Sequence, residues 1–137
     1  MTVVTNKGQL TQLEVVLVQE KESLRINFSN TGQTEYFIDE KLALKDGVMT
    51  LSCLKVTHAG LTIDSKMAIK ASPSKFPDEF IKIDIGETYT VDVGLSAIFE
   101  VSDFKSVRVE FDGINSLPDG ELDFLTSNTI TFEIDTH

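Results

Sequence analysis

The chain has 137 residues, of which 41% are hydrophobic and 25% charged, and its formal net charge is −10 at pH 7. This composition is ordinary for a soluble globular protein and excludes an intrinsically disordered one, and the length fits one domain over residues 1–137. The negative field argues against nucleic acid and anionic membrane surfaces as partners. The acidity then has two remaining explanations, which are solubility and attraction of a basic partner.

A two-residue alternation of apolar and polar side chains dominates the first part of the chain. It predicts a strand over about 10–19 and another over 24–28, joined into a hairpin by the charged turn 20–23. Turn-forming residues at 30–33 end the second strand. The short apolar segment 36–38 that follows is predicted to be an edge strand.

The middle of the chain alternates between strand and turn signals. An Asp-Gly turn precedes a predicted strand over 48–56, and a further strand is expected over 61–64. Cys53, the one cysteine, lies in the first of these and is expected to be a small core residue rather than a nucleophile. The segment 72–78 is the clearest loop, because its two prolines each remove a backbone donor that a central strand would need.

Four further strands and one helical turn are predicted in the last third of the chain. The strands cover about 80–85, 89–93, 107–111 and 130–134, and a single helical turn is expected over 94–99. Asp-Gly at 112–113 indicates the end of the third of these strands, with a loop that runs on to residue 120.

This pattern predicts an all-β fold of about eight or nine strands. Turn signals recur about every ten residues, and crossover helices between the strands are lacking, so a parallel α/β fold is excluded. We therefore expect an antiparallel two-sheet sandwich of immunoglobulin-like type.

The sequence carries no recognisable catalytic motif, and we expect no enzymatic activity and no cofactor. The chain has only His58 and His137 as histidines, with no His-Glu-x-x-His, Cys-x-x-Cys, Gly-x-Ser-x-Gly or phosphate-binding loop. His58 precedes a glycine turn and is expected to be an exposed loop or strand-end residue. Paired carboxylates leave a hydrolase as the weakest alternative.

The acidic segment around residue 120 is the only candidate metal site. Calcium prefers six to eight oxygen ligands, and five oxygen-bearing side chains gather here, but their spacing does not match an EF-hand. The ordinary interpretation is a solubilising hairpin loop, so no metal site is predicted. The calcium candidates are Asp112, Asn115, Asp119, Glu121 and Asp123.

Four motifs resemble a known family of domains. They are Phe28–Gly32 (ending Asn-x-Gly), Val56–Ile63 (Val-x-x-x-Gly), Phe80–Thr88 (an apolar strand closed by Gly-Glu-Thr) and Val91–Ser96 (ending in Leu-Ser). Their order resembles the non-catalytic β-sandwich domain that accompanies deuterolysin and peptidyl-Lys type zinc endopeptidases and occurs in small standalone bacterial proteins. The family's Gly-x-Tyr and Tyr-x-Gly are absent. The resemblance implies a sandwich fold and a protease-associated or partner-binding role without activity.

We therefore expect a non-enzymatic protein-binding module, protease-associated or a protease inhibitor, with a protein partner that is a peptidase in the most concrete version. The binding residues are predicted in the proline-containing loop at Ser74, Lys75 and Phe76, where Phe76 either anchors a partner or packs back on the core. The alternative is a structural, self-associating sandwich that pairs its edge at 36–38. A monomer or a weak homodimer is expected accordingly.

The N-terminal residues lack the pattern of a secretory signal, and no stretch is apolar for long enough to span a bilayer. We therefore expect a soluble, cytoplasmic protein, or a secreted one if a signal peptide precedes this sequence.

Overall fold

The computed structural model of the chain describes residues 13–40, 42, 53–63, 75–117 and 120–134. Within these ranges the structure consists mainly of strands, with one short helix, α2 (Leu95–Ile98), where a helical turn was predicted. The all-β prediction is confirmed. None of the helical structure in these ranges has the length and apolar character needed to cross a bilayer.

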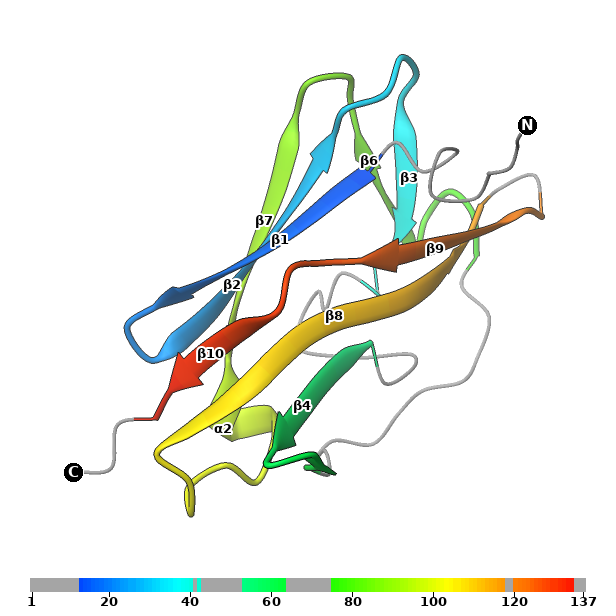
Figure 1. Cartoon of the computed structure of the whole chain (residues 1–137). Helices are drawn as coiled ribbons and strands as arrows, with labels where there is room; N and C mark the ends of the chain where they lie inside the picture. Colours follow the sequence, from blue (N-terminus) through cyan, green and yellow to red (C-terminus); the bar gives the residue numbers. More distant parts are fainter. Residues whose placement is uncertain (1–12, 41, 43–52, 64–74, 118–119, 135–137) are drawn as a thin grey trace, which may run out of the picture.

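The strands form antiparallel ladders in a sandwich-like arrangement (Figure 1). In chain order they are β1 (Leu13–Glu20), β2 (Ser23–Asn30), β3 (Tyr36–Asp39), β4 (Leu54–His58), β5 (Leu61–Thr62), β6 (Phe80–Ile83), β7 (Thr88–Gly94), β8 (Ser106–Ser116), β9 (Leu122–Thr126) and β10 (Ile130–Glu133). One sheet has the order β1-β2-β7, and another has the order β10-β8-β4-β5, with β9 paired to β8. The pair β3-β6 makes a third, separate ladder in the described part of the chain, which a simple two-sheet prediction did not include.

The core lies between the sheets that contain β2 and β8. Strand β2 buries every second side chain, among them Leu24, Ile26 and Phe28, as its alternation predicts. The ring of Phe28 meets that of Phe111 on β8 edge-to-face, with centroids 5.5 Å apart. Each such fully buried side chain contributes about 1.5–3 kcal/mol to the free energy of folding. In the described ranges the buried apolar residues form a single contiguous cluster.

Side-chain amides join the two sheets at their edges. The Leu17 amide of β1 donates to Oδ1 of Asn128 at 2.8 Å, and Asn128 Nδ2 donates back to the Leu17 carbonyl at 3.1 Å. Gln19 makes the same pair of bonds with the backbone of Glu133 on β10, at 2.8 and 2.9 Å. An amide carries a donor and an acceptor side by side, so it replaces a neighbouring strand at an edge that would otherwise be open.

Strand β8 extends further than the sequence predicted. Asp112 and Gly113 were interpreted as the end of this strand, which is wrong, because β8 continues to Ser116. Gly113 is buried, and a Cβ at this position would lie 2.7 Å from Leu42 Cδ1 and 3.3 Å from the Cβ of Cys53. The glycine therefore provides space for a close approach and does not form a turn.

Strand β9 was not predicted, because its alternation is inverted relative to the core. Asp123 and Leu125 point inward and are buried, whereas Leu122 and Phe124 point outward and are exposed. A strand that buries a carboxylate and exposes a phenylalanine does not show the expected pattern of apolar residues on one face.

The other predicted elements match the described strands closely. The short edge strand at 36–38 and the strands at 89–93 and 130–134 are confirmed, and so is the first hairpin from Leu13 onward, since residues 10–12 lie outside the described ranges. The strands predicted at 61–64 and 80–85 are present but end earlier, at Thr62 and Ile83. The predicted strand 48–56 is seen from Leu54, and residues 48–52 lie outside the described ranges.

Candidate functional site

The predicted binding loop forms a compact turn before β6. Ser74 lies outside the described residues. The exposed Lys75 donates its amide to Glu79 Oε1 at 2.6 Å and accepts a hydrogen bond from the Glu79 amide at 2.8 Å. The amide of Phe80 donates to the Pro77 carbonyl at 3.1 Å. These bonds hold the backbone of the turn in one conformation.

Phe76 is both packed and exposed. Its ring lies edge-on to Phe37 of β3, at 5.0 Å between centroids, and to Phe80 of β6, at 5.6 Å. The side chain nevertheless remains 48% exposed. Perpendicular ring contacts are the favoured aromatic geometry and orient each ring. The three residues Phe37, Phe76 and Phe80 are called the aromatic cluster below.

The structure separates the calcium candidates between two faces of the β8–β9 hairpin. Asp112 is exposed and pairs with Lys55 of β4 at 3.5 Å, whereas Asn115 and Asp123 point into the interior. Glu121 is exposed, and Asp119 lies outside the described residues. Nowhere in the described ranges do three His, Cys, Asp or Glu side chains group as metal ligands would.

A buried polar network connects β3 to this hairpin. The Tyr36 hydroxyl donates to Asp123 Oδ2 at 2.6 Å and accepts a hydrogen bond from Asn115 Nδ2 at 3.1 Å. All three side chains are buried. Burial, with a further contribution from the hydrogen bond to Asp123, raises the pKa of Tyr36 well above its ordinary value. The phenol is therefore protonated and serves as the hydrogen-bond donor that a buried carboxylate needs.

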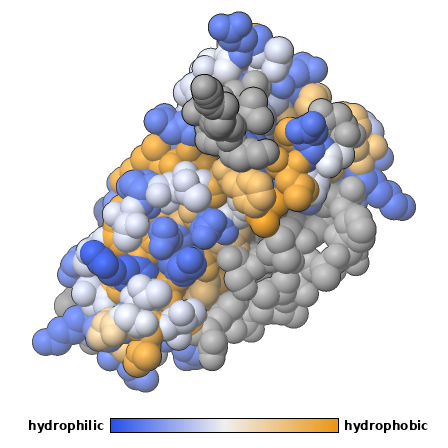
Figure 2. Space-filling view, turned by 45° about the vertical axis from the view of Figure 1, so that its right-hand side comes forward, coloured by the Kyte–Doolittle hydropathy of each residue, from blue (hydrophilic) through white to orange (hydrophobic). Residues whose placement is uncertain are grey.

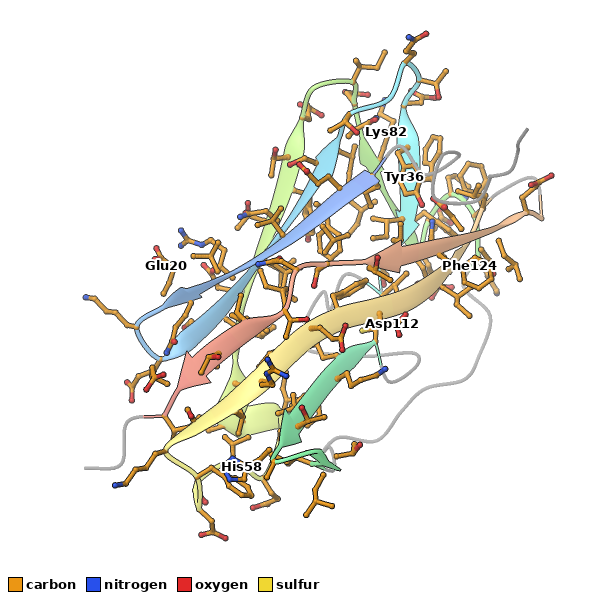
Figure 3. All side chains as sticks on the ribbon, in the orientation of Figure 1. Glu20, Tyr36, His58, Lys82, Asp112 and Phe124 are labelled. Atoms are coloured by element: carbon orange, nitrogen blue, oxygen red, sulfur yellow. The ribbon has the colours of Figure 1, made fainter. Side chains whose placement is uncertain are left out.

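Asn115 also forms hydrogen bonds with the backbone of β3. Its Oδ1 accepts from the Asp39 amide at 2.9 Å, and its Nδ2 donates to the Phe37 carbonyl at 2.9 Å. This is the third two-point contact between a side-chain amide and an edge strand. The contact also places the backbone of Phe37, one member of the aromatic cluster, beside the end of the β8–β9 hairpin. Figure 3 labels Tyr36 on β3 and Phe124 on β9 at this end of the molecule.

The outward face of the β8–β9 hairpin exposes three large apolar side chains. Ile114 is 40%, Leu122 50% and Phe124 47% exposed. Ile114 lies directly opposite Phe124 in the strand register, and Leu122 follows two residues away on the same face. Figure 2, in which the right-hand side of Figure 1 comes forward, shows hydrophobic side chains at the surface among hydrophilic ones. We call Ile114, Leu122 and Phe124 the apolar stripe.

Cys53 and His58 belong neither to the aromatic cluster nor to the apolar stripe. Cys53 is fully buried, as predicted, and burial raises the pKa of its thiol to about 12. A thiol in such a setting is not an active nucleophile at neutral pH. His58 is exposed at the end of β4, where Nδ1 lies 3.1 Å from the Ser106 carbonyl and the ring packs on Phe104. Its prediction as a strand-end residue is confirmed.

Sequence reasoning singled out Phe76 but missed the residues around it. Phe37 lies between two core residues of a strand, and Phe80 begins another, so neither was distinguishable from an ordinary strand residue. The inverted alternation of residues 122–125, with apolar residues flanking an acid, was the available signal for the stripe.

No protein-family model matches this chain, and no curated protein matches it either. The resemblance to the endopeptidase-associated domain therefore stays a prediction that rests on the four quoted motifs.

Proposed function

We propose that this chain is a non-enzymatic protein-binding module that engages its partner through the turn 75–79 and the aromatic cluster. In the most concrete version it is protease-associated or inhibits a peptidase. One observation carries the proposal, which is that Phe76 stays half exposed while two ring contacts fix its orientation.

A fixed, exposed aromatic ring is suited to binding. Because the ring and the turn are ordered before the partner arrives, little conformational entropy is lost on association. Aromatic side chains also contribute a disproportionate share of binding energy when a partner buries them. The neighbouring Lys75 is exposed and supplies a charge at the rim of the same surface.

The alternative, self-association through the edge strand β3, has less support. Pairing by β-strand addition needs free backbone groups along the edge. The Asp39 amide and the Phe37 carbonyl already bond to Asn115, so a second copy would have to displace that side chain.

We also propose the immunoglobulin-like class for the sandwich. Two observations support this, the sheet orders β1-β2-β7 and β10-β8-β4-β5 and an isolated parallel bridge between Val15 of the first strand and Ser127 just before the last. In such folds the first strand lies beside the last one as well as beside the second.

A double variant with Lys75→Ala and Phe76→Ala removes the exposed side chains of this surface. The full chain is tested for binding and inhibition against purified serine, cysteine, aspartic and metallo peptidases, and is used for affinity capture from the source cell. The double variant should bind the partner found in this way about tenfold more weakly or worse. Its free energy of unfolding should fall by only about 1 kcal/mol, because the lost ring is half exposed.

The matched control is Leu61→Ala on β5, which removes an exposed apolar side chain at 73% exposure and should leave binding unchanged. Retention of full affinity by the double variant, or failure of the protein to bind any peptidase or captured partner, would contradict the proposal.

A further inference from the structure

The apolar stripe is an exposed surface that the proposed function does not use. Ile114, Leu122 and Phe124 project from neighbouring positions of two paired strands, so their side chains form one patch. The opposite face of β8 points into the interior, where Asn115 donates to the Tyr36 hydroxyl and to the Phe37 carbonyl. An apolar patch with a polar rim is typical of an interaction site.

Acidic residues predominate in the stretch of sequence that contains the stripe. From Val109 to the C-terminus the chain holds seven acidic residues and no Lys or Arg, although the whole chain has 12 basic residues. The seven are Glu110, Asp112, Asp119, Glu121, Asp123, Glu133 and Asp135. Two of the exposed ones adjoin the stripe, Glu121 immediately before Leu122 and Asp112 on the same face of β8 as Ile114. The Asp112 charge is partly balanced by Lys55, whereas the sum over the segment stays strongly negative.

We propose that the apolar stripe docks a basic amphipathic segment of a partner protein. The partner's apolar side chains pack on Ile114 and Phe124, and its Lys or Arg side chains face the acids around them. Charge complementarity selects this occupant over a second copy of the chain, because a second copy would bring the same acids to the same face. The apolar component gives affinity, and the charges give orientation and a faster encounter.

The test uses an amphipathic helical peptide of leucine and lysine as the probe, with a leucine and glutamate peptide of the same pattern as its counterpart. Titration calorimetry at physiological salt should detect binding of the lysine peptide only. The double variant Ile114→Thr with Phe124→Thr keeps the charge and the strand propensity, and should weaken that binding about tenfold. Leu61→Thr on β5 is the matched control and should leave it unchanged.

A second variant, Glu121→Gln, tests the charge separately and leaves the apolar side chains intact. It should weaken binding several-fold, and less so at high salt. Equal affinities for the wild type and the stripe variant would show that net charge alone holds the peptide and would overturn the proposal. A concentration-dependent dimer in sedimentation that the stripe variant abolishes would overturn it too, in favour of self-association.

The outcome is separable from that of the proposed function. None of these variants alters the aromatic cluster, and the Lys75→Ala, Phe76→Ala variant leaves the stripe intact. Loss of one binding activity with retention of the other would assign each to its own surface.

Discussion

At the scale of single residues, the interior of this protein contains a hydrogen-bonded carboxylate. Asp123 is buried next to the Tyr36 hydroxyl, which is itself oriented by Asn115. Leaving a buried acceptor without its donor costs about 1–3 kcal/mol, more for a charged group. The tyrosine at position 36 is therefore needed for its hydroxyl as well as for its ring.

Tyr36→Phe should lower the free energy of unfolding by about 1–3 kcal/mol at pH 7, measured by urea denaturation. The folded protein raises the pKa of this phenol above its ordinary value of 10.0, so its stabilising contribution is complete below pH 10. That contribution falls as pH rises above 10, because the unfolded state loses the proton first. The difference in free energy of unfolding between the wild type and Tyr36→Phe should therefore become smaller above pH 10.

Tyr89→Phe on β7 is the control for removal of a phenol hydroxyl, since this side chain lies only partly buried at the margin of the core. An equal loss of stability in both variants, or a difference for Tyr36→Phe that does not change with pH, would show that the network has no special role.

Gly113 gives a second prediction at this scale. Gly113→Ala should destabilise the protein by about 1–3 kcal/mol, because the new methyl group would overlap Leu42 and press on Cys53. Thermal unfolding measures the change. Gly94→Ala is the matched control, since its Cβ would meet only Ala97 at 3.9 Å, and it should cost less than 1 kcal/mol.

The same mechanism predicts that Leu42→Val relieves part of the cost of Gly113→Ala, so that the double variant is more stable than the sum of the single changes implies. Strict additivity of the two changes would mean that lack of space is not the reason for the glycine.

At the scale of elements, side-chain amides form hydrogen bonds with backbone groups at strand edges that no neighbouring strand pairs. Asn128, Gln19 and Asn115 each present an amide to the backbone of an edge residue, at Leu17, Glu133 and the β3 edge respectively. These contacts join ladders that share no continuous strand pairing. Because the amide has both a donor and an acceptor, a carboxylate of the same shape does not replace it.

Asn128→Asp tests this directly. It replaces the donor to the Leu17 carbonyl with an acceptor, and should cost about 1 kcal/mol at pH 7 in urea denaturation. The cost should fall in acid, where the new carboxyl group becomes protonated and can donate again. Asn27→Asp is the control, because the Asn27 side chain accepts through its oxygen from Thr90 at 2.7 Å and, among the described residues, its amide nitrogen makes no hydrogen bond that the change would remove. Equal effects at the two sites would argue against the role of Asn128 in joining the sheets.

The strands that could be predicted from the sequence are those whose outer face is polar. Leu24, Ile26 and Phe28 alternate with polar residues, so β2 was evident, whereas Leu122 and Phe124 expose their side chains and hid β9. Asp-Gly is a turn signal, so the sequence favoured the wrong interpretation at Gly113, where the close approach of Leu42 explains the glycine. Of the aromatic cluster only Phe76 was predicted. Phe37 comes from β3, which is distant in sequence, and Phe80 is close in sequence but looks like any other residue of an apolar strand.

At the scale of the whole molecule, the two-residue rhythm predicted the class of fold but not the arrangement of its ladders. Local alternation determines which face of a strand is buried, and it carries no information about which strand lies beside it. The separate β3-β6 ladder, held against β8 by Asn115, depends on contacts between residues more than 70 positions apart in the chain. The two proposed surfaces also arise only here, where the aromatic cluster and the apolar stripe come to the same end of the molecule.

The burial of Cys53 has a practical consequence. Its thiol is fully buried and donates to the Leu42 carbonyl at 3.8 Å, so the intact molecule shields the one cysteine of the chain from oxidants and from alkylating reagents alike. The rate at which an alkylating reagent modifies Cys53 would therefore report how often the β4–β8 region opens, and the chain has no other cysteine to contribute to the signal.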